Sequence, residues 1–149
     1  MKRFIVFLDR GLTGVTYAAY IILLIYIAVS YGPGADLIKV ILVPASGFLI
    51  ETIIRERLDF KRPYEVSGRP PLIPKETRGK SFPSRHAFSV TMIAVTYLFY
   101  LREAGIVMLM IALALCVIRV AGGVHFVRDV IAGAALAAAY GVFFMMILK

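Results

Sequence analysis

The two histidines of this chain are its most informative residues, because each stands close to other polar side chains. His125 precedes Asp129 by four positions, so a helix through this stretch would place both side chains on one face. A carboxylate that holds one imidazole nitrogen raises the basicity of the other, which can then act as a nucleophile or a base. Arg119, six residues before His125, ends an apolar stretch, where a charge is costly and commonly functional. A surface histidine with a chance acidic neighbour is the alternative.

His86 belongs to the run Pro83-Ser84-Arg85-His86, which directly precedes another apolar stretch. Ser84 is a favourable N-cap residue, and the N-terminus of a helix presents free backbone N–H groups and a positive dipole end to an anion. An ordinary helix cap would look the same. Both histidines are nevertheless expected at helix starts, which favours a shared anion site.

Two arginines, Arg55 and Arg62, lie in the sequence RERLDFKRP after a further apolar stretch. Guanidinium groups bind phosphate oxygens through paired, charge-assisted hydrogen bonds. Basic residues after a membrane span are often only an interfacial belt. It is the combination with the two histidines that indicates a phosphate site.

The composition places these residues in a membrane protein. The chain has 149 residues, of which 60% are hydrophobic and 17% charged, with a mean hydropathy of +0.85. A soluble domain is about 45–50% apolar and about 25% charged. The net charge of +8 then indicates anionic lipid or a phosphorylated substrate rather than nucleic acid. The single cysteine, Cys116, excludes an internal disulfide, and we expect no metal site, since no cluster of ligands is visible.

We expect an all-α membrane bundle of about five transmembrane helices, forming one domain over residues 1–149. Crossing about 30 Å of hydrocarbon takes about 20 apolar residues. The expected spans are approximately residues 12–31, 35–54, 86–101, 104–121 and 130–148. A turn around residues 102–105 predicts that the third and fourth spans form a hairpin, and Gly133, Ala137 and Gly141 predict close packing of the fifth. Residues 1–10 are either an interfacial helix or the first turns of the first span.

Alternating crossings bring the polar residues together at one membrane face. The polar loop 55–85, the start of the third span, the connection between the last two spans and the N-terminus share that face, and the C-terminus lies on the other. Of the 17 Lys and Arg residues, 14 fall on this face and three on the other (Lys39, Arg102 and Lys149). The positive-inside rule would make the face cytoplasmic. A phosphate site needs basic residues on either side, so the sequence leaves the orientation in the cell membrane open.

Together these motifs resemble the signature of the type-2 phosphatidic acid phosphatase family, membrane relatives of the acid phosphatases and vanadium haloperoxidases. That signature is Lys-x6-Arg-Pro, then Pro-Ser-Gly-His, then Arg-x5-His-x3-Asp. The chain reads Arg55-x6-Arg62-Pro63, Pro83-Ser84-Arg85-His86 and Arg119-x5-His125-x3-Asp129. It departs from the family at Arg55, which replaces Lys, at Arg85, which replaces Gly, and at Ile118, where the family often has Ser. Membrane members also commonly have six spans.

The resemblance implies a metal-independent phosphatase that works through a phosphohistidine and needs no cofactor. His125 would attack phosphorus and Asp129 would orient it, while His86 would protonate the leaving group and then activate water. The phosphate oxygens would be held by the remaining motif residues, namely Arg55, Arg62, Ser84, Arg85 and Arg119.

The implied substrate is a lipid phosphate or diphosphate in the bilayer. Undecaprenyl diphosphate is our first expectation, and phosphatidic acid, phosphatidylglycerol phosphate and a lipid A phosphate are alternatives within the family. A lipid phosphotransferase, which passes the phosphate to an alcohol, would need the same residues. A non-catalytic scaffold that binds phosphate lipids is the third possibility. The sequence indicates no oligomeric state.

Overall fold

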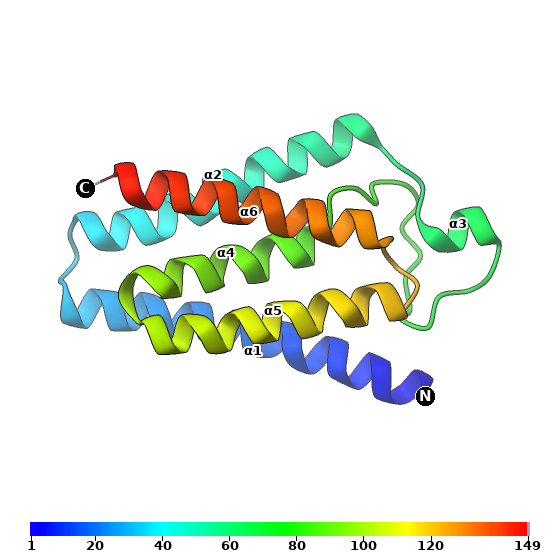
Figure 1. The fold of residues 1–149 in the computed structure, drawn as a ribbon, viewed down its shortest axis with the longest axis horizontal. Coiled ribbons are helices and arrows are strands. Elements are labelled where there is room, and N and C mark those ends of the chain that lie inside the picture. The colour runs from blue at the N-terminus through cyan, green and yellow to red at the C-terminus, as the bar shows by residue number, and fades with distance from the viewer. Residues whose placement is uncertain (149) are drawn as a thin grey trace.

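The computed structural model describes residues 1–148 and is all-helical, with no strand in that range. This confirms the predicted fold class. The helices are α1 (Lys2–Ser30), α2 (Ala35–Leu58), α3 (Pro63–Ser67), α4 (Arg85–Tyr100), α5 (Arg102–Ala121) and α6 (Val127–Ile147). Five of them are long and run along the long axis of the molecule, whereas the short α3 lies in the loop at one end (Figure 1).

Helix α4 lies at the centre of the bundle, in contact with the four other long helices. Ten of its 16 residues are buried. By length and composition, α1, α2, α5 and α6 can each cross a membrane, whereas α4 spans only about 24 Å at 1.5 Å per residue. Because the other helices shield it from lipid, α4 does not need the full length of a lipid-facing helix. The protein is therefore a multi-pass membrane protein, and its number of membrane-spanning helices is close to the predicted five.

The structure decides one boundary that the sequence left open and moves a second one. Helix α1 begins at Lys2 and continues without a break, so residues 2–10 are the first turns of the first span. The hairpin between α4 and α5 turns at the single residue Leu101 rather than at residues 102–105. Gly105 allows so tight a turn, because a Cβ atom at this position would lie 2.7 Å from the backbone nitrogen of Leu98.

The small residues of α6 bring it against α4. Gly133, Ala137 and Gly141 are all buried, as the spacing predicts. A Cβ atom on Gly133 would lie 2.5 Å from the carbonyl oxygen of Ser84, so only glycine permits this approach. The contact places the first turn of α6 beside the first turn of α4.

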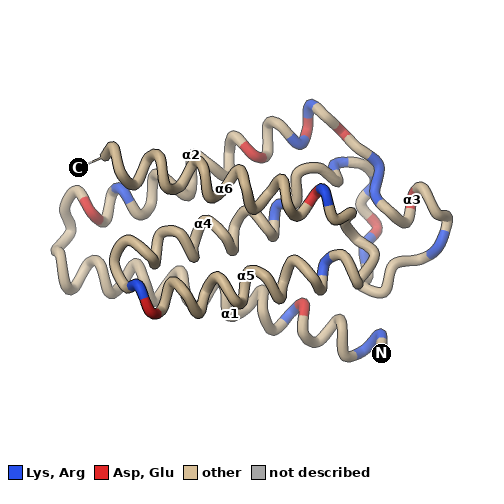
Figure 2. Tube along the Cα trace, in the orientation of Figure 1, with Lys and Arg blue, Asp and Glu red and all other residues tan. Residues whose placement is uncertain are grey.

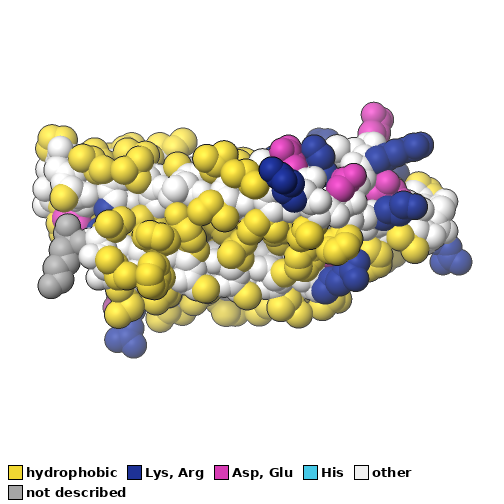
Figure 3. All heavy atoms as spheres, turned by 90° about the horizontal axis from the view of Figure 1, so that it is seen from above, with side chains coloured by type: hydrophobic (Ala, Val, Ile, Leu, Met, Phe, Trp, Pro, Cys, Tyr) yellow, Lys and Arg dark blue, Asp and Glu magenta, His cyan; other side chains and the backbone are white. Residues whose placement is uncertain are grey.

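Charged residues gather at one end of the bundle. Figure 2 shows most Lys, Arg, Asp and Glu positions around α3, the neighbouring loop and the N-terminus, and the C-terminus lies at the opposite end. A smaller charged group lies at that opposite end (Figure 2). Asp36 and Lys39 pair there at the start of α2, where Asp36 also accepts a hydrogen bond from Tyr100 at the end of α4, and Arg102 and Glu103 begin α5. Hydrophobic side chains cover most of the length between the two ends (Figure 3). This distribution suits a bundle that crosses a bilayer with its polar loop at one face.

Candidate active site

His125 and Asp129 meet at the start of α6. Asp129 lies in the first turn of this helix. His125 lies in the connection that precedes the helix, although the sequence had suggested a position on it. The imidazole Nδ1 nevertheless faces the Asp129 carboxylate, 3.6 Å from Oδ2. The exposed fraction is 2% for His125 and zero for Asp129. The pair is therefore withdrawn from water, with Nε2 left as the nitrogen that can react.

Backbone and hydroxyl groups fix the Asp129 carboxylate. Its Oδ2 accepts hydrogen bonds from the Ser81 hydroxyl at 2.5 Å and from the backbone N–H of Phe126 at 3.0 Å. The backbone N–H of Ser84 donates to the Asp129 carbonyl at 2.9 Å, which ties α4 to α6. Ser81 is fully buried, and it lies outside the motifs that the sequence analysis used. No sequence signal separates it from the other serines.

We expect Ser81→Ala to lower kcat/KM about tenfold without unfolding the protein. The substitution removes one hydrogen bond to a buried charge, which leaves the carboxylate less firmly oriented toward His125. Ser30→Ala, at the exposed end of α1, is the matched control and should leave kcat/KM unchanged. Equal kcat/KM for the two variants would show that Ser81 does not support the catalytic pair.

Arg62 holds the loops of the site together. Only 1% of this residue is exposed, and its guanidinium donates to the carbonyl oxygens of Gly79 (2.9 Å), Lys80 (3.2 Å) and Val124 (3.1 Å). Val124 immediately precedes His125. Three of the five guanidinium N–H groups are therefore engaged with backbone, and two remain for an anion.

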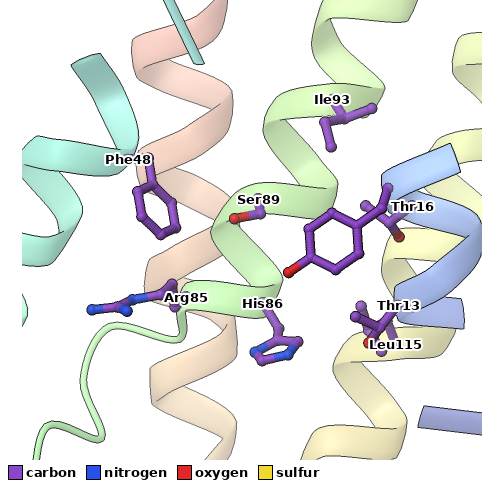
Figure 4. Close-up of a pocket in the computed structure, with 9 residues that line it drawn as sticks. Thr13, Thr16, Phe48, Arg85, His86, Ser89, Ile93 and Leu115 are labelled. Atoms are coloured by element: carbon purple, nitrogen blue, oxygen red, sulfur yellow. The ribbon is translucent and has the colours of Figure 1, made fainter. Parts of the chain in front are cut away.

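The other motif arginines are each held by a neighbour. The guanidinium of Arg55 donates to the Pro83 carbonyl at 3.2 Å, and that of Arg119 donates to Asp9 at 2.9 Å. Arg85 lies 3.6 Å from the fully buried carboxylate of Glu51. Its side chain extends away from His86 (Figure 4). The resting site thus keeps Arg55 and Arg119 buried and Arg85 turned toward α2.

Ser84 and His86 occupy the first turn of α4. Ser84 is the N-cap residue, but its side chain makes no capping hydrogen bond, contrary to our expectation. The Ser84 hydroxyl is buried and has no hydrogen-bond partner within residues 1–148. His86 faces a cavity of about 70 Å³ whose wall also contains Thr13, Thr16 and Tyr17 from α1 (Figure 4). Both side chains are thus available to a bound anion.

Burial and positive charge set the protonation of His125. Burial is the main cause that lowers its pKa to about 4, and the charges of Arg119, Arg62 and Arg55 lower it further. The neighbouring carboxylate of Asp129 raises this pKa. The imidazole is therefore neutral at pH 7, as a nucleophile must be.

The folded protein should lose stability as the pH falls from about 6.5 to about 4. In this window the unfolded chain takes up a proton at residue 125 that the folded protein does not accept, so the contribution is complete above pH 6.5. We expect the melting temperature to fall less steeply on acidification in His125→Gln than in the wild type. Identical pH dependence of the two melting temperatures would contradict this prediction.

Lys75, in the loop before α4, is a half-buried basic residue that the sequence analysis did not single out. Burial lowers its pKa, and so do the charges of Arg62, Arg119, Arg55 and Arg85, in that order. It has no distinctive spacing in the sequence, where it is one of several basic residues in a proline-rich loop. Within the described residues, no group of three or more His, Cys, Asp or Glu side chains is placed to hold a metal ion.

Fold and site together define a helical membrane protein with buried histidine, aspartate and arginine side chains at one end of its bundle. The chain belongs to the PAP2 superfamily, whose family model matches residues 36–149. This membership confirms the family predicted from the three motifs, and with it the class of enzyme, a membrane lipid phosphatase. None of the curated proteins matches the sequence.

Two solved structures share the fold. The chain is similar to LpxE of Aquifex aeolicus, with 21% sequence identity and a TM-score of 0.74 over 97% of this chain and 92% of that one. It is also similar to a transmembrane PAP2-type phosphatidylglycerolphosphate phosphatase from Bacillus subtilis, with 23% identity and a TM-score of 0.67 over 97% and 81% of the two chains. Both likenesses include α1, which precedes the residues that match the family model.

Proposed function

We propose that this protein hydrolyses a lipid phosphate or diphosphate in the cell membrane through a phosphohistidine on His125, without a metal ion. The observation that carries the proposal is the buried His125–Asp129 pair at the polar end of a membrane bundle. The positive charges of Arg55, Arg62 and Arg119 act on its imidazole. An in-line transfer of a phosphoryl group requires such a nucleophile together with fixed positive charge around the equatorial oxygens.

In the first step His125 displaces the lipid from phosphorus. The Nε2–P bond forms while the bond between phosphorus and the leaving oxygen breaks. His86, which takes up a proton from solvent when the phosphate dianion binds, donates that proton to the leaving oxygen. Asp129, whose Oδ2 lies 3.6 Å from Nδ1, stabilises the positive charge that develops on the ring. The leaving group is the lipid alcohol for a monophosphate and the lipid monophosphate for a diphosphate.

In the second step water releases the phosphate. His86, now neutral, accepts a proton from a water molecule, whose oxygen attacks phosphorus as the N–P bond breaks. Inorganic phosphate leaves and His125 is again a neutral imidazole. The buried hydroxyl of Ser84 and the arginines hold the phosphate oxygens through both steps.

A second cavity supports a lipid substrate. It has a volume of about 360 Å³ and adjoins the His86 cavity, since Tyr17, Phe48, Ser89 and Ile93 line both. The rest of its wall is largely apolar and comes from α1, α2 and α4 (Tyr20, Ile41, Pro44, Ala45, Phe88 and Met92). A hydrocarbon chain in this cavity would place its terminal phosphate beside His86.

Among lipid phosphates we propose a polyprenyl diphosphate, undecaprenyl diphosphate in particular, as the first substrate to test. Three buried motif arginines, Arg55, Arg62 and Arg119, lie in the site, and several positive charges suit a diphosphate. Phosphatidic acid, phosphatidylglycerol phosphate and a lipid A phosphate are the other members of the substrate panel.

The test is phosphate release by the purified protein in detergent with EDTA, measured separately on undecaprenyl diphosphate, phosphatidic acid, phosphatidylglycerol phosphate and a lipid A phosphate. We expect release to persist in EDTA and to be fastest with the diphosphate. An arm with an added alcohol measures transfer, because a phosphotransferase would form a new phosphate ester in place of inorganic phosphate. Absence of both products from every lipid would overturn the proposal and favour a lipid-binding scaffold.

A further inference from the structure

Asp9 brings a carboxylate from α1 into the polar end of the bundle. It accepts a hydrogen bond from Nη1 of Arg119 at 2.9 Å, although the two residues are 110 positions apart. The side chains of Asp9 and Arg119 are 10% and 4% exposed. Asp9 belongs to none of the motifs and precedes the residues that match the family model.

A buried carboxylate in a membrane helix is costly unless it is paired, and such residues are commonly functional. The same face of α1 continues into the wall of the active site. Thr13 and Thr16, about one and two turns after Asp9, line the cavity that contains His86 (Figure 4). Helix α1 is thus a wall of the candidate site at the level of Asp9 and for two turns beyond it.

The ion pair with Asp9 leaves one side of the Arg119 guanidinium available. Asp9 binds only Nη1, whereas Nε is buried and has no hydrogen-bond partner in the described part of the chain. Nε and Nη2 form the edge of a guanidinium that can bind two phosphate oxygens in parallel. An ion pair at Nη1 fixes the plane of the group without occupying that edge.

We infer that Asp9 is a positioning residue that orients Arg119 so that its Nε–Nη2 edge binds the phosphoryl group. This inference rests on the proposed function, and it adds α1 to the parts of the chain that determine activity. The opposite arrangement, in which Asp9 competes with the phosphate for Arg119, makes the opposite prediction: removing the carboxylate would strengthen phosphate binding.

The test compares Asp9→Asn with the wild type. Asparagine keeps the shape of the side chain and removes its charge. We expect kcat/KM to fall about tenfold, mainly through kcat, because a correctly oriented guanidinium matches the equatorial oxygens of the transition state better than those of the bound substrate. The inhibition constant for orthovanadate should rise by a similar factor. Asp9→Glu should recover part of the loss. Asp36→Asn, which removes a carboxylate at the opposite end of the bundle, should leave both constants unchanged.

A double-mutant cycle separates positioning from a general effect on the fold. If Asp9 acts through Arg119, Asp9→Asn should have no further effect on kcat/KM in an Arg119→Ala background. Additive losses, or unchanged constants in the single variant, would overturn the inference. Tighter inhibition by vanadate would also overturn the inference, and it would show that Asp9 competes with the phosphate for Arg119.

Binding of inorganic phosphate, measured by calorimetry in the same detergent, provides a readout that does not depend on turnover. We expect Asp9→Asn to weaken this binding about tenfold relative to the wild type and Asp36→Asn. Phosphate bound without any hydrolysis would count against the proposed function and not against the role of Asp9. Equal affinities in the wild type and Asp9→Asn would count against Asp9 alone.

Discussion

Replacing His125 by asparagine should reduce phosphate release about 10⁴-fold or more with every lipid phosphate that the wild type hydrolyses. The substitution removes Nε2, the atom that we propose attacks phosphorus, and losses of this size follow removal of a nucleophile. Asparagine is smaller than histidine but polar, so the loop should keep its hydrogen bonds to Arg62 and the site should remain folded.

The comparison for His125→Asn is Ser30→Ala, purified and assayed in parallel, with melting temperature and elution volume measured for both. We expect a folded, inactive His125 variant and a fully active Ser30 variant. Activity within tenfold of the wild type would mean that another group attacks phosphorus, and the phosphohistidine mechanism would be wrong.

Arg62→Lys should lose both stability and activity, which distinguishes Arg62 from a simple phosphate ligand. Lysine retains the charge but cannot reach three carbonyl oxygens in the planar arrangement that the guanidinium provides. Buried carbonyls left without donors should cost about 2–4 kcal/mol of unfolding free energy. Activity should fall at least a hundredfold, because the Val124 carbonyl precedes the nucleophile.

Arg69→Lys is the control for Arg62→Lys, since Arg69 is exposed in the same loop region. Chemical denaturation in detergent gives the stability change, and phosphate release gives the activity. A variant of Arg62 that loses activity but keeps wild-type stability would show that its role is confined to binding the substrate phosphate.

The fold could be predicted from the sequence because apolar stretches of sufficient length leave few alternatives in a membrane. Alternating crossings then determined which polar residues share a face. The details of the connections were less predictable. The α4–α5 turn needs only Leu101, because Gly105 lets α5 approach Leu98, and this depends on packing between the two helices.

The motif residues could be selected from the sequence because their spacing is specific to the family, whereas the residues that contact them could not. Ser81 reaches Asp129 across 48 positions, and Asp9 reaches Arg119 across 110. No local pattern encodes contacts at such separations. Lys75 is placed by the course of the loop, whose residues Leu72 and Ile73 donate backbone hydrogen bonds to Gly122. These residues meet their partners only when the helices and the loop pack together.

The local chemistry of single residues also depended on tertiary contacts. Ser84 has the residue type and position of a helix cap, yet its hydroxyl makes no capping bond. Its backbone N–H donates a hydrogen bond to the Asp129 carbonyl of α6. His125 lies ahead of α6 and not on it, and Gly123, with φ +73°, forms part of the turn that carries it there. The proximity of His125 and Asp129 therefore comes from a turn and a helix start, and not from helical periodicity.

The most direct test of the mechanism is to trap the intermediate. Protein carrying His86→Ala is mixed with a lipid diphosphate that carries ³²P in its terminal phosphate, quenched in base and digested. The lipid monophosphate that leaves in the first step needs no proton from residue 86, so the variant should form the phosphohistidine but hydrolyse it slowly. We predict label that is stable in base and labile in acid, confined to the peptide that contains His125 and absent from a His86→Ala, His125→Ala double variant. Label that persists in the double variant, or turnover of the lipid by the single variant without any labelled peptide, would contradict the proposed phosphohistidine.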